Sequence, residues 1–216
     1  MDYLINKIKN KNDKSTYYVS LRYKFIVYHF KNFIEEKYCK IWIEWIKKNI
    51  YFPKKNYIKL FGKQVLTPRL QTAFGDEGTS YKFSGTIVEA KPWKKELLIL
   101  KKVAEDLSGF KLNFCLINYY RNGKDYIGFH SDDEKDLDKT APIVSITFGV
   151  DRLFEFKSND SKMHDKFNKK FTISNGDVVV FEALTNEYYK HSVLKQIHIN
   201  KPRWNFTFRK IIVQKK

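Results

Sequence analysis

The chain has 216 residues, a length that suits one domain with a substantial buried core. No stretch approaches the ~20 apolar residues that a membrane-spanning helix needs, and no apolar segment of the secretory type adjoins the Lys-rich start. We therefore expect neither a membrane anchor nor a secretion signal. The two cysteines, Cys39 and Cys115, stand in apolar surroundings without metal-type pairing, which indicates a reducing intracellular compartment.

The formal net charge is +17, which favours a polyanionic partner, most of all nucleic acid. Of the 41 basic residues, 35 are Lys and six are Arg, and the chain is also rich in Asn, Ile, Phe and Tyr. AT-rich codons favour these residue types, so biased coding is an alternative source of part of the charge. Charge alone therefore suggests nucleic acid without establishing it.

In chain order, residues 1–30 read as a basic N-terminal arm and a lead-in, with the first 15 or so flexible. Asn32 and Glu35 have the spacing of a capping box, which predicts a helix from there to about Asn49. Its expected apolar stripe is Ile34, Tyr38, Ile41 and Trp45. A second helix is expected to begin near Pro92 and to end at Gly109, with an apolar stripe of Leu97, Leu100, Ala104 and Leu107.

From Asn113 onward the pattern predicts strands separated by turn signals such as Asn122-Gly123. Two helices followed by about eight short strands indicate an α+β protein whose strands form a double-stranded β-helix, or jelly roll. The predicted strands are 113–120, 126–130, 143–149, 152–157, 170–173, 177–182, 190–195 and 203–213.

The last predicted strand carries an informative alternation, because side chains at i and i+2 share one face. Arg203, Asn205, Thr207 and Arg209 lie on one face, and Trp204, Phe206 and Phe208 on the other. If the aromatic face packs into the core, both guanidiniums face a cavity or solvent. A cavity that binds a dicarboxylate would satisfy them, and a solvated edge strand is the alternative. Asn118 and Tyr120 alternate in the same way on the first strand.

His130, Asp132 and His191 have the residue types of a non-haem iron site, in which two imidazoles and one carboxylate occupy one face of Fe(II). Taken singly, each has a simpler interpretation, since an isolated His-x-Asp is mostly structural and His191 could be a satisfied buried imidazole. Taken together and in strand context they favour a metal. His29, His164 and His198 lack such context and are interpreted as surface or core histidines.

Several stretches in the order expected for one family cover roughly residues 60–212. They resemble the AlkB-type Fe(II)- and 2-oxoglutarate-dependent dioxygenases, and most closely the eukaryotic homologues that repair alkylated double-stranded DNA. The stretches are Pro68-Arg-Leu-Gln71 with Gly75-Asp76, Tyr81-Lys-Phe-Ser-Gly85, Pro92-Trp93, Leu116-Ile-Asn-Tyr-Tyr120, Gly128-Phe-His-Ser-Asp-Asp-Glu134, Ser145-Ile-Thr-Phe-Gly149, His191-Ser192 and Arg203 to Arg209.

The resemblance implies a jelly-roll domain over 31–216 with a nucleotide-recognition lid within 52–112. It implies that His130, Asp132 and His191 bind Fe(II), and that Arg203 pairs with the far carboxylate of 2-oxoglutarate, with Asn118, Tyr120, Thr207 and Arg209 completing that pocket. The implied reaction uses O2 to remove N-alkyl groups from 1-methyladenine and 3-methylcytosine in DNA, releasing succinate, CO2 and an aldehyde.

The resemblance also implies residues that contact the nucleic acid. A base methylated at adenine N1 or cytosine N3 is cationic and poorly paired, which suits an anionic contact, aromatic faces and base flipping. Asp133 resembles the base-recognising carboxylate, with a solvated acidic turn as the alternative. Phe61 has ordinary core packing as its alternative. The implied substrate contacts are Phe61, Gly62 and Lys63 of a finger, Arg69, the lid residues Tyr81, Lys82 and Phe83, and Asp133.

One departure concerns strand preference: the basic run that follows the distal histidine in duplex-repair homologues is weaker here, at Lys195-Gln-Ile-His198. Single-stranded DNA and RNA therefore stay open as substrates. The alternatives are an RNA demethylase and a nucleic-acid-binding protein with the fold but no catalysis; a protein hydroxylase is disfavoured by the charge and the lid. We expect a monomer inside the cell, nuclear in a eukaryote and otherwise in a bacterial cytoplasm or a virus-infected cell.

Overall fold

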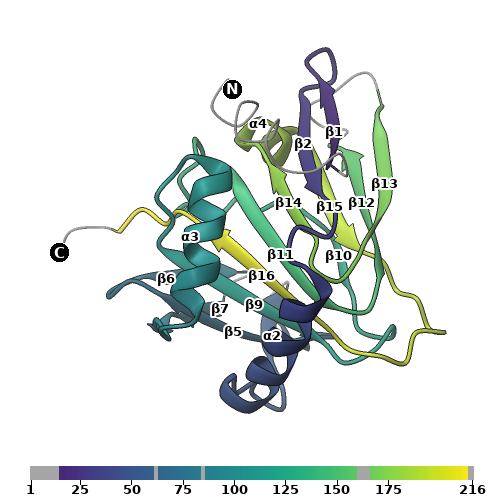
Figure 1. Cartoon of the computed structure of the whole chain (residues 1–216). Coiled ribbons are helices and arrows are strands. Elements are labelled where there is room, and N and C mark those ends of the chain that lie inside the picture. Colours follow the sequence, from purple (N-terminus) through teal and green to yellow (C-terminus); the bar gives the residue numbers. More distant parts are fainter. Residues whose placement is uncertain (1–14, 61–62, 84–85, 160–165, 214–216) are drawn as a thin grey trace.

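The computed structural model describes residues 15–60, 63–83, 86–159 and 166–213. Two β-sheets face each other, and two long helices cover the outer face of the larger sheet (Figure 1). The helices are α2 (Glu36–Asn49), α3 (Leu97–Ser108) and the short α4 (Ala183–Tyr188). The strands are β1 (Ser15–Ser20), β2 (Phe25–Phe30), β3 (Tyr57–Leu60), β4 (Lys63–Leu66), β5 (Leu70–Gly75), β6 (Ser80–Phe83), β7 (Thr86–Glu89), β8 (Lys91–Pro92), β9 (Phe114–Tyr120), β10 (Ile127–His130), β11 (Ile143–Gly149), β12 (Arg152–Ser158), β13 (Asn168–Ile173), β14 (Val178–Phe181), β15 (Tyr189–Val193) and β16 (Arg203–Arg209).

The larger sheet has eight strands in the order β1-β2-β14-β11-β16-β9-β5-β8, and the smaller has four in the order β10-β15-β12-β13. Neighbouring strands are antiparallel apart from the β5–β8 pair. The hairpins β3–β4 and β6–β7 form separate two-stranded sheets within the expected lid region. This arrangement confirms the predicted α+β class with a jelly-roll core.

Strand alternation divides the interior into two cores. Trp204, Phe206 and Phe208 of β16 pack on the helix side with α2 and α3. The residues between them face the smaller sheet, where a second apolar cluster, including Phe156 of β12 and Tyr189 of β15, joins the two sheets. The predicted alternation along 203–209 is confirmed, and its polar face lies between the sheets.

The N-terminal elements differ from the prediction. Residues 1–14, expected to be a flexible arm, lie outside the described residues, and residues 15–30 form β1 and β2, of which β2 pairs with β14 inside the larger sheet. The prediction of a capping box at Asn32 was wrong. The helix begins at Glu36, and Asn32 has a left-handed φ of 49° with its N–H donating to Asp177 Oδ1 at 2.8 Å.

The helix stripes were predicted with mixed success. In α2 the buried residues are Cys39 and Ile46, whereas Tyr38 and Ile41 are exposed, because the helix sits about one residue out of the predicted phase. In α3 the predicted stripe is buried and Gly109 ends the helix in a left-handed conformation, as expected. Its start was wrong: Lys91–Pro92 is a short strand that pairs with β5, and the helix begins at Leu97.

The C-terminal strands match the prediction closely, with shifts at their ends. Two features were missed: α4 lies between β14 and β15, and β16 ends at Arg209 rather than at residue 213. No helix within the described ranges has the length and apolar character needed to cross a membrane.

Candidate iron and 2-oxoglutarate site

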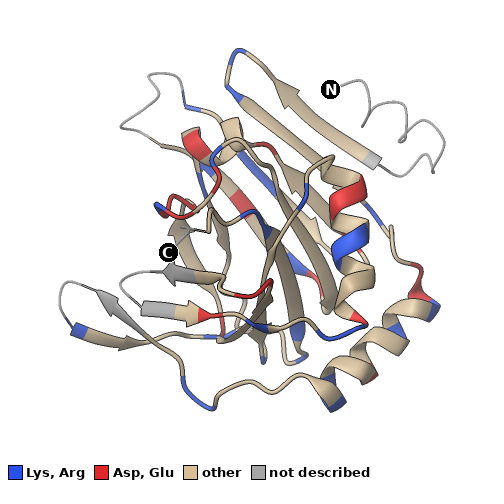
Figure 2. Ribbon diagram, turned by 90° about the vertical axis from the view of Figure 1, so that its left-hand side faces the viewer, with Lys and Arg blue, Asp and Glu red and all other residues tan. Residues whose placement is uncertain are grey.

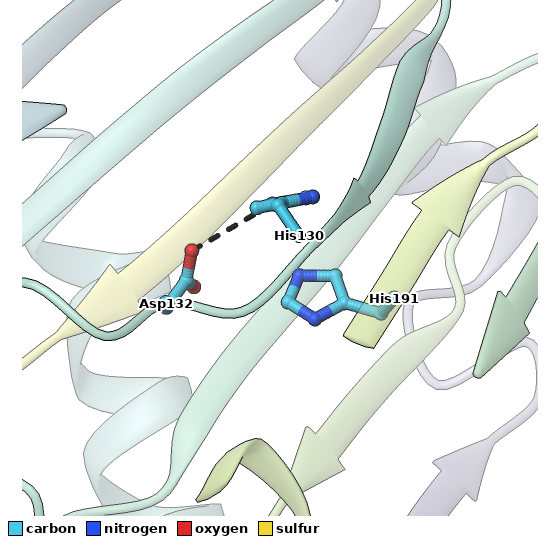
Figure 3. A group of neighbouring side chains, drawn as sticks. All are labelled: His130, Asp132 and His191. Carbon is cyan, nitrogen blue, oxygen red and sulfur yellow. Dashed lines mark ion pairs between the residues drawn. The ribbon is translucent and has the colours of Figure 1, made fainter. Parts of the chain in front are cut away.

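The three predicted metal ligands converge between the two sheets (Figure 3). His130 ends β10 and lies directly opposite His191 of β15, with ring centroids 4.3 Å apart. Asp132 follows two residues after His130, and its Oδ1 lies 3.7 Å from His130 Nε2. One ligand atom from each residue lies within 4.8 Å of the others, which is close enough for all three to bind one ion.

The surroundings keep these groups in metal-binding form, since imidazoles bind metal when neutral and carboxylates when ionised. Burial lowers the pKa of His130, and it lowers the pKa of His191 to about 3. Burial alone would raise the pKa of Asp132, but the Arg209 charge and the two histidines outweigh it and hold that pKa well below its usual range. Arg209 donates to Asp132 Oδ2 from Nη2 at 2.7 Å and from Nε at 3.0 Å.

Their orientation is fixed by neighbouring backbone. The His130 Nδ1 atom lies 3.0 Å from the Gly128 carbonyl oxygen, which leaves Nε2 for a metal. Asn186 of α4 bridges the Asp132 main chain: its Oδ1 accepts from Asp132 N at 3.1 Å, and its Nδ2 donates to Asp132 O at 2.5 Å. The short helix that the sequence analysis missed therefore anchors a ligand.

The predicted anion site is centred on Arg203 of β16, the strand that also carries Arg209. Arg203 is 1% exposed, and its Nη2 donates to Asn205 Oδ1 at 2.6 Å and to Thr147 Oγ1 at 2.8 Å. Its Nε and Nη1 have no hydrogen-bond partner among the described residues. Burial lowers the pKa of Arg203 to about 10, so the group stays charged at neutral pH. A buried cation with unpaired donors fits one carboxylate of a dicarboxylate.

The other residues predicted for this pocket are also buried here. The Tyr120 ring lies near two guanidiniums, with its centroid 5.3 Å from Arg203 Cζ and 5.5 Å from Arg152 Cζ. Thr207 accepts a hydrogen bond from Asn205 Nδ2 at 2.7 Å. Sequence reasoning missed Thr147 and Arg152. Thr147 was hidden because its contact with Arg203 depends on pairing between distant strands.

The chain as a whole matches a known family. The 2OG-Fe(II) oxygenase superfamily model matches residues 26–209. The chain belongs to this superfamily. Within it, the chain is of the AlkB type, with 36% identity over 163 residues to the human DNA oxidative demethylase ALKBH2, covering 74% of this chain and 62% of the human protein.

Three further similarities agree. The mouse DNA oxidative demethylase ALKBH2 is 35% identical, covering 74% of this chain and 68% of the relative, and human alpha-ketoglutarate-dependent dioxygenase alkB homolog 3 is 33% identical, covering 67% and 52%. The solved structure titled "The structure of OsALKBH1" aligns with a TM-score of 0.62 over 85% of this chain and 96% of that chain. At 17% identity, that likeness shows the fold alone.

In this AlkB-type chain, Asn118 and Arg69 bind each other, although they were predicted for different roles. Asn118 Oδ1 accepts from Arg69 Nε and from Gln71 Nε2, each at 2.9 Å. Arg69 is 3% exposed, and its charge contributes to lowering the pKa of His130, after burial and alongside Arg209. Arg69 is therefore buried beside Asn118, and its predicted contact with the substrate stays a prediction; Gln71 is a neighbour that the sequence analysis did not single out.

The predicted substrate contacts are less fully placed. Phe61 and Gly62 lie outside the described residues, and the side chains of Tyr81, Lys82 and Phe83 in β6 do too. Lys63 begins β4 and is exposed. Asp133 is exposed on the loop after β10, where it helps to line a cavity of about 190 Å³ with Ser131, Asp132, Asn186 and Glu187, among others. Its role in recognising a base stays a prediction.

Proposed function

We propose that this protein is an Fe(II)- and 2-oxoglutarate-dependent DNA oxidative demethylase that removes alkyl groups from 1-methyladenine and 3-methylcytosine. The observation that supports this most is the convergence of His130, Asp132 and His191, together with the buried Arg203, whose Nε and Nη1 have no hydrogen-bond partner among the described residues. The family supplies the chemistry, and two of the similar relatives bear the name DNA oxidative demethylase.

In this proposal the metal ligands come from one side of the interior. His130, His191 and Asp132 Oδ1 hold Fe(II), while Arg209 neutralises the second oxygen of Asp132 and keeps that carboxylate ionised and oriented. When bound, Fe(II), 2-oxoglutarate and O2 would supply the oxidising chemistry that hydroxylates the N-alkyl carbon, with succinate, CO2 and an aldehyde as the by-products.

The larger sheet supplies the cosubstrate contacts. Arg203 would offer Nε and Nη1 to the far carboxylate of 2-oxoglutarate, and Thr147 and Asn205 fix its third nitrogen. The Tyr120 ring packs against the same guanidinium and limits the volume beside it. A monocarboxylate would leave this buried cation without a partner, which favours a dicarboxylate.

The substrate side follows from the chemistry of the lesion. Methylation at adenine N1 or cytosine N3 gives a cationic base that cannot pair normally, so flipping it out of a strand costs less than for a normal base. We assign Asp133 to the cationic base, Tyr81, Lys82 and Phe83 to the slot, and Phe61, Gly62 and Lys63 to the finger. The net charge of +17 suits a polyanion, and we propose a monomer acting inside a cell.

The test is an oligonucleotide panel. The protein is incubated with Fe(II), 2-oxoglutarate and ascorbate and with matched 1-methyladenine or 3-methylcytosine oligonucleotides as single-stranded DNA, duplex DNA and RNA, and the nucleosides are then quantified by mass spectrometry. We expect loss of the methylated nucleoside from DNA with stoichiometric succinate. Turnover of RNA alone would indicate an RNA demethylase. Binding to all three without succinate would contradict catalysis.

A further inference from the structure

A buried histidine outside the metal site carries a further inference. His29 of β2 is fully buried and lies on the face of the larger sheet that points toward the smaller sheet, with its ring centroid 5.0 Å from that of Phe171. Its Nε2 lies 2.7 Å from Oδ2 of Asp177, which is 2% exposed. An ionisable pair in an apolar interior is costly unless each polar atom is well bonded, so its contacts are informative.

Asp177 is bonded to more than His29. Its Oδ2 also accepts from Ser174 N at 2.9 Å, and its Oδ1 accepts from Asn32 N at 2.8 Å. Three segments therefore meet at one carboxylate: β2, the link that follows it, and the turn that precedes β14. Gly176 tightens this junction, because a Cβ there would overlap the Ile34 carbonyl oxygen.

The same turn holds the main chain of Thr147 from both sides. Thr147 N donates to Asp177 O at 3.0 Å, and Gly176 N donates to Thr147 O at 2.9 Å. The Thr147 hydroxyl oxygen then accepts from Arg203 Nη2 at 2.8 Å. A series of hydrogen bonds, linked through the covalent structure of Asp177 and of Thr147, thus runs from His29 to the Arg203 guanidinium that is predicted to bind 2-oxoglutarate.

Asp177 also acts on Arg203 through space. Burial lowers the pKa of Arg203, and the Asp177 carboxylate is among the groups that raise it in opposition. The turn therefore sets both the position of one Arg203 contact and part of the electrostatic field around it.

We infer that His29 and Asp177 are positioning residues for Arg203, and that the His29–Asp177 bond sets the affinity of the site for the dicarboxylate cosubstrate. This inference rests on the proposed function, in which Arg203 binds 2-oxoglutarate. A purely structural pair would stabilise the sandwich without affecting that affinity.

The test compares His29→Leu, which fills the space without a donor, with His29→Gln, which retains one. Thr185→Val is the matched control: Thr185 is fully buried and bonds β2 through Ile26 N at 2.7 Å and Ile26 O at 2.9 Å, outside the series of hydrogen bonds that leads to Thr147. The Kd of 2-oxoglutarate is measured by calorimetry with Mn(II) in place of Fe(II), alongside thermal unfolding and, with Fe(II), KM and kcat for demethylation.

We expect His29→Leu to raise Kd and KM for 2-oxoglutarate by about tenfold, the size of one lost hydrogen bond in a charged network, with kcat at saturating cosubstrate little changed. His29→Gln should recover most of the affinity. Thr185→Val should lower the unfolding temperature and leave Kd unchanged. If His29→Leu does not fold, His29→Phe, which keeps a ring but likewise has no donor, gives the same comparison.

A double-mutant cycle checks the route through Thr147. Thr147→Val should raise Kd, and combining it with His29→Leu should raise Kd by less than the product of the two single effects. Independent, multiplicative effects would overturn the route, and an unchanged Kd in a destabilised His29→Leu would overturn the inference while leaving the proposed function intact. A wild-type protein that binds no 2-oxoglutarate would overturn both.

Discussion

Asp132 has two different partners, one for each carboxylate oxygen. Oδ2 is bonded twice by Arg209 of β16, and Oδ1 lies on the side of His130. This division lets one oxygen bind a metal while the other is held by a fixed charge. It also means that the carboxylate and the guanidinium depend on each other, because both are buried.

We expect Asp132→Ala to abolish demethylation, because two imidazoles alone hold Fe(II) weakly, and to lower the free energy of unfolding by about 3 kcal/mol, because Arg209 keeps its charge but loses its main counter-ion. Turnover and urea unfolding are the measurements. The control variant Asp133→Ala, at the adjacent exposed position, should have a free energy of unfolding within about 0.5 kcal/mol of the wild-type value. Normal turnover in Asp132→Ala would refute the ligand assignment.

Asp133 has a separate prediction. If its carboxylate contacts the cationic base, Asp133→Asn should raise KM for a 1-methyladenine oligonucleotide by about tenfold, since it removes one charge-assisted contact, and should leave KM for 2-oxoglutarate unchanged. Steady-state kinetics with each substrate varied in turn separates the two values. Equal KM values for the oligonucleotide would leave Asp133 as part of a solvated acidic turn.

At the level of elements, the loop between β10 and β11 is tied to the end of the last strand. Asp138 Oδ2 pairs with Lys210 Nζ at 2.9 Å, and Asp138 N donates to Lys210 O at 2.9 Å. Asp138 Oδ1 accepts from Thr140 N and Oγ1. Since this loop carries Asp132 and Asp133, its attachment to Lys210 helps to hold both residues in position.

This anchorage should depend on pH. Hydrogen bonds from Lys210, followed by those from Thr140, lower the pKa of Asp138 to about 2 from 3.8. A carboxyl group with a depressed native pKa contributes stability that is complete above about pH 4 and is lost as pH falls toward 2. Asp138→Asn should therefore cost about 1 kcal/mol at pH 7, with the difference shrinking below pH 4. Urea unfolding at pH 7 and at pH 3 measures it, and a constant difference would contradict the assignment.

Two glycines, Gly123 in the turn after β9 and Gly128 in β10, allow a matched comparison of crowded and open positions. A Cβ at Gly123 would overlap the Gln196 carbonyl oxygen, whereas a Cβ at Gly128 would meet no atom within 4 Å. Gly123 also bonds Ile199 and Gln196 through its main chain. Gly123→Ala should cost about 2 kcal/mol of stability through overpacking, and Gly128→Ala should cost little. Equal unfolding temperatures for the two variants would show that the turn relaxes.

The predictable elements were those whose apolar and polar side chains recur at strict intervals along the sequence. The alternation along Arg203–Arg209 gave both faces of β16 correctly, and the resemblance supplied the roles that the structure brings together around His130 and His191. Helix starts were not predictable, because the Asn32 N–H bonds Asp177, a residue 145 positions away, instead of capping a helix. The Asn118–Arg69 contact was hidden for the same reason, since pairing of β5 with β9 creates it.

At the scale of the whole molecule, charge is spread rather than gathered. Figure 2 shows Lys and Arg on both long helices and at many strand ends, with acidic residues between them. Net charge therefore predicts general attraction to a polyanion, whereas specific contacts have to come from particular elements such as the β3–β4 hairpin that carries Lys63.

We expect affinity for an oligonucleotide to fall linearly on a log–log plot against salt concentration, because each neutralised phosphate releases counter-ions. Lys63→Ala should reduce that slope by about one if Lys63 contacts a phosphate. Lys48→Ala, on α2, is the control and should leave the slope unchanged. Fluorescence anisotropy from low to moderate salt measures both, and equal slopes would remove Lys63 from the interface.

The bond between Arg209 and Asp132 joins the strand that carries Arg203 to the loop that follows β10. It therefore links the smaller sheet, which presents the two imidazoles, to the larger sheet, which presents the guanidinium of Arg203. Because Arg203 and Arg209 lie on the same strand, the position of Asp132 relative to Arg203 depends on β16. If Arg203 binds 2-oxoglutarate as proposed, we expect 2-oxo diacids shorter or longer by one methylene to bind more weakly, because β16 holds Arg203 and Arg209 at a fixed separation.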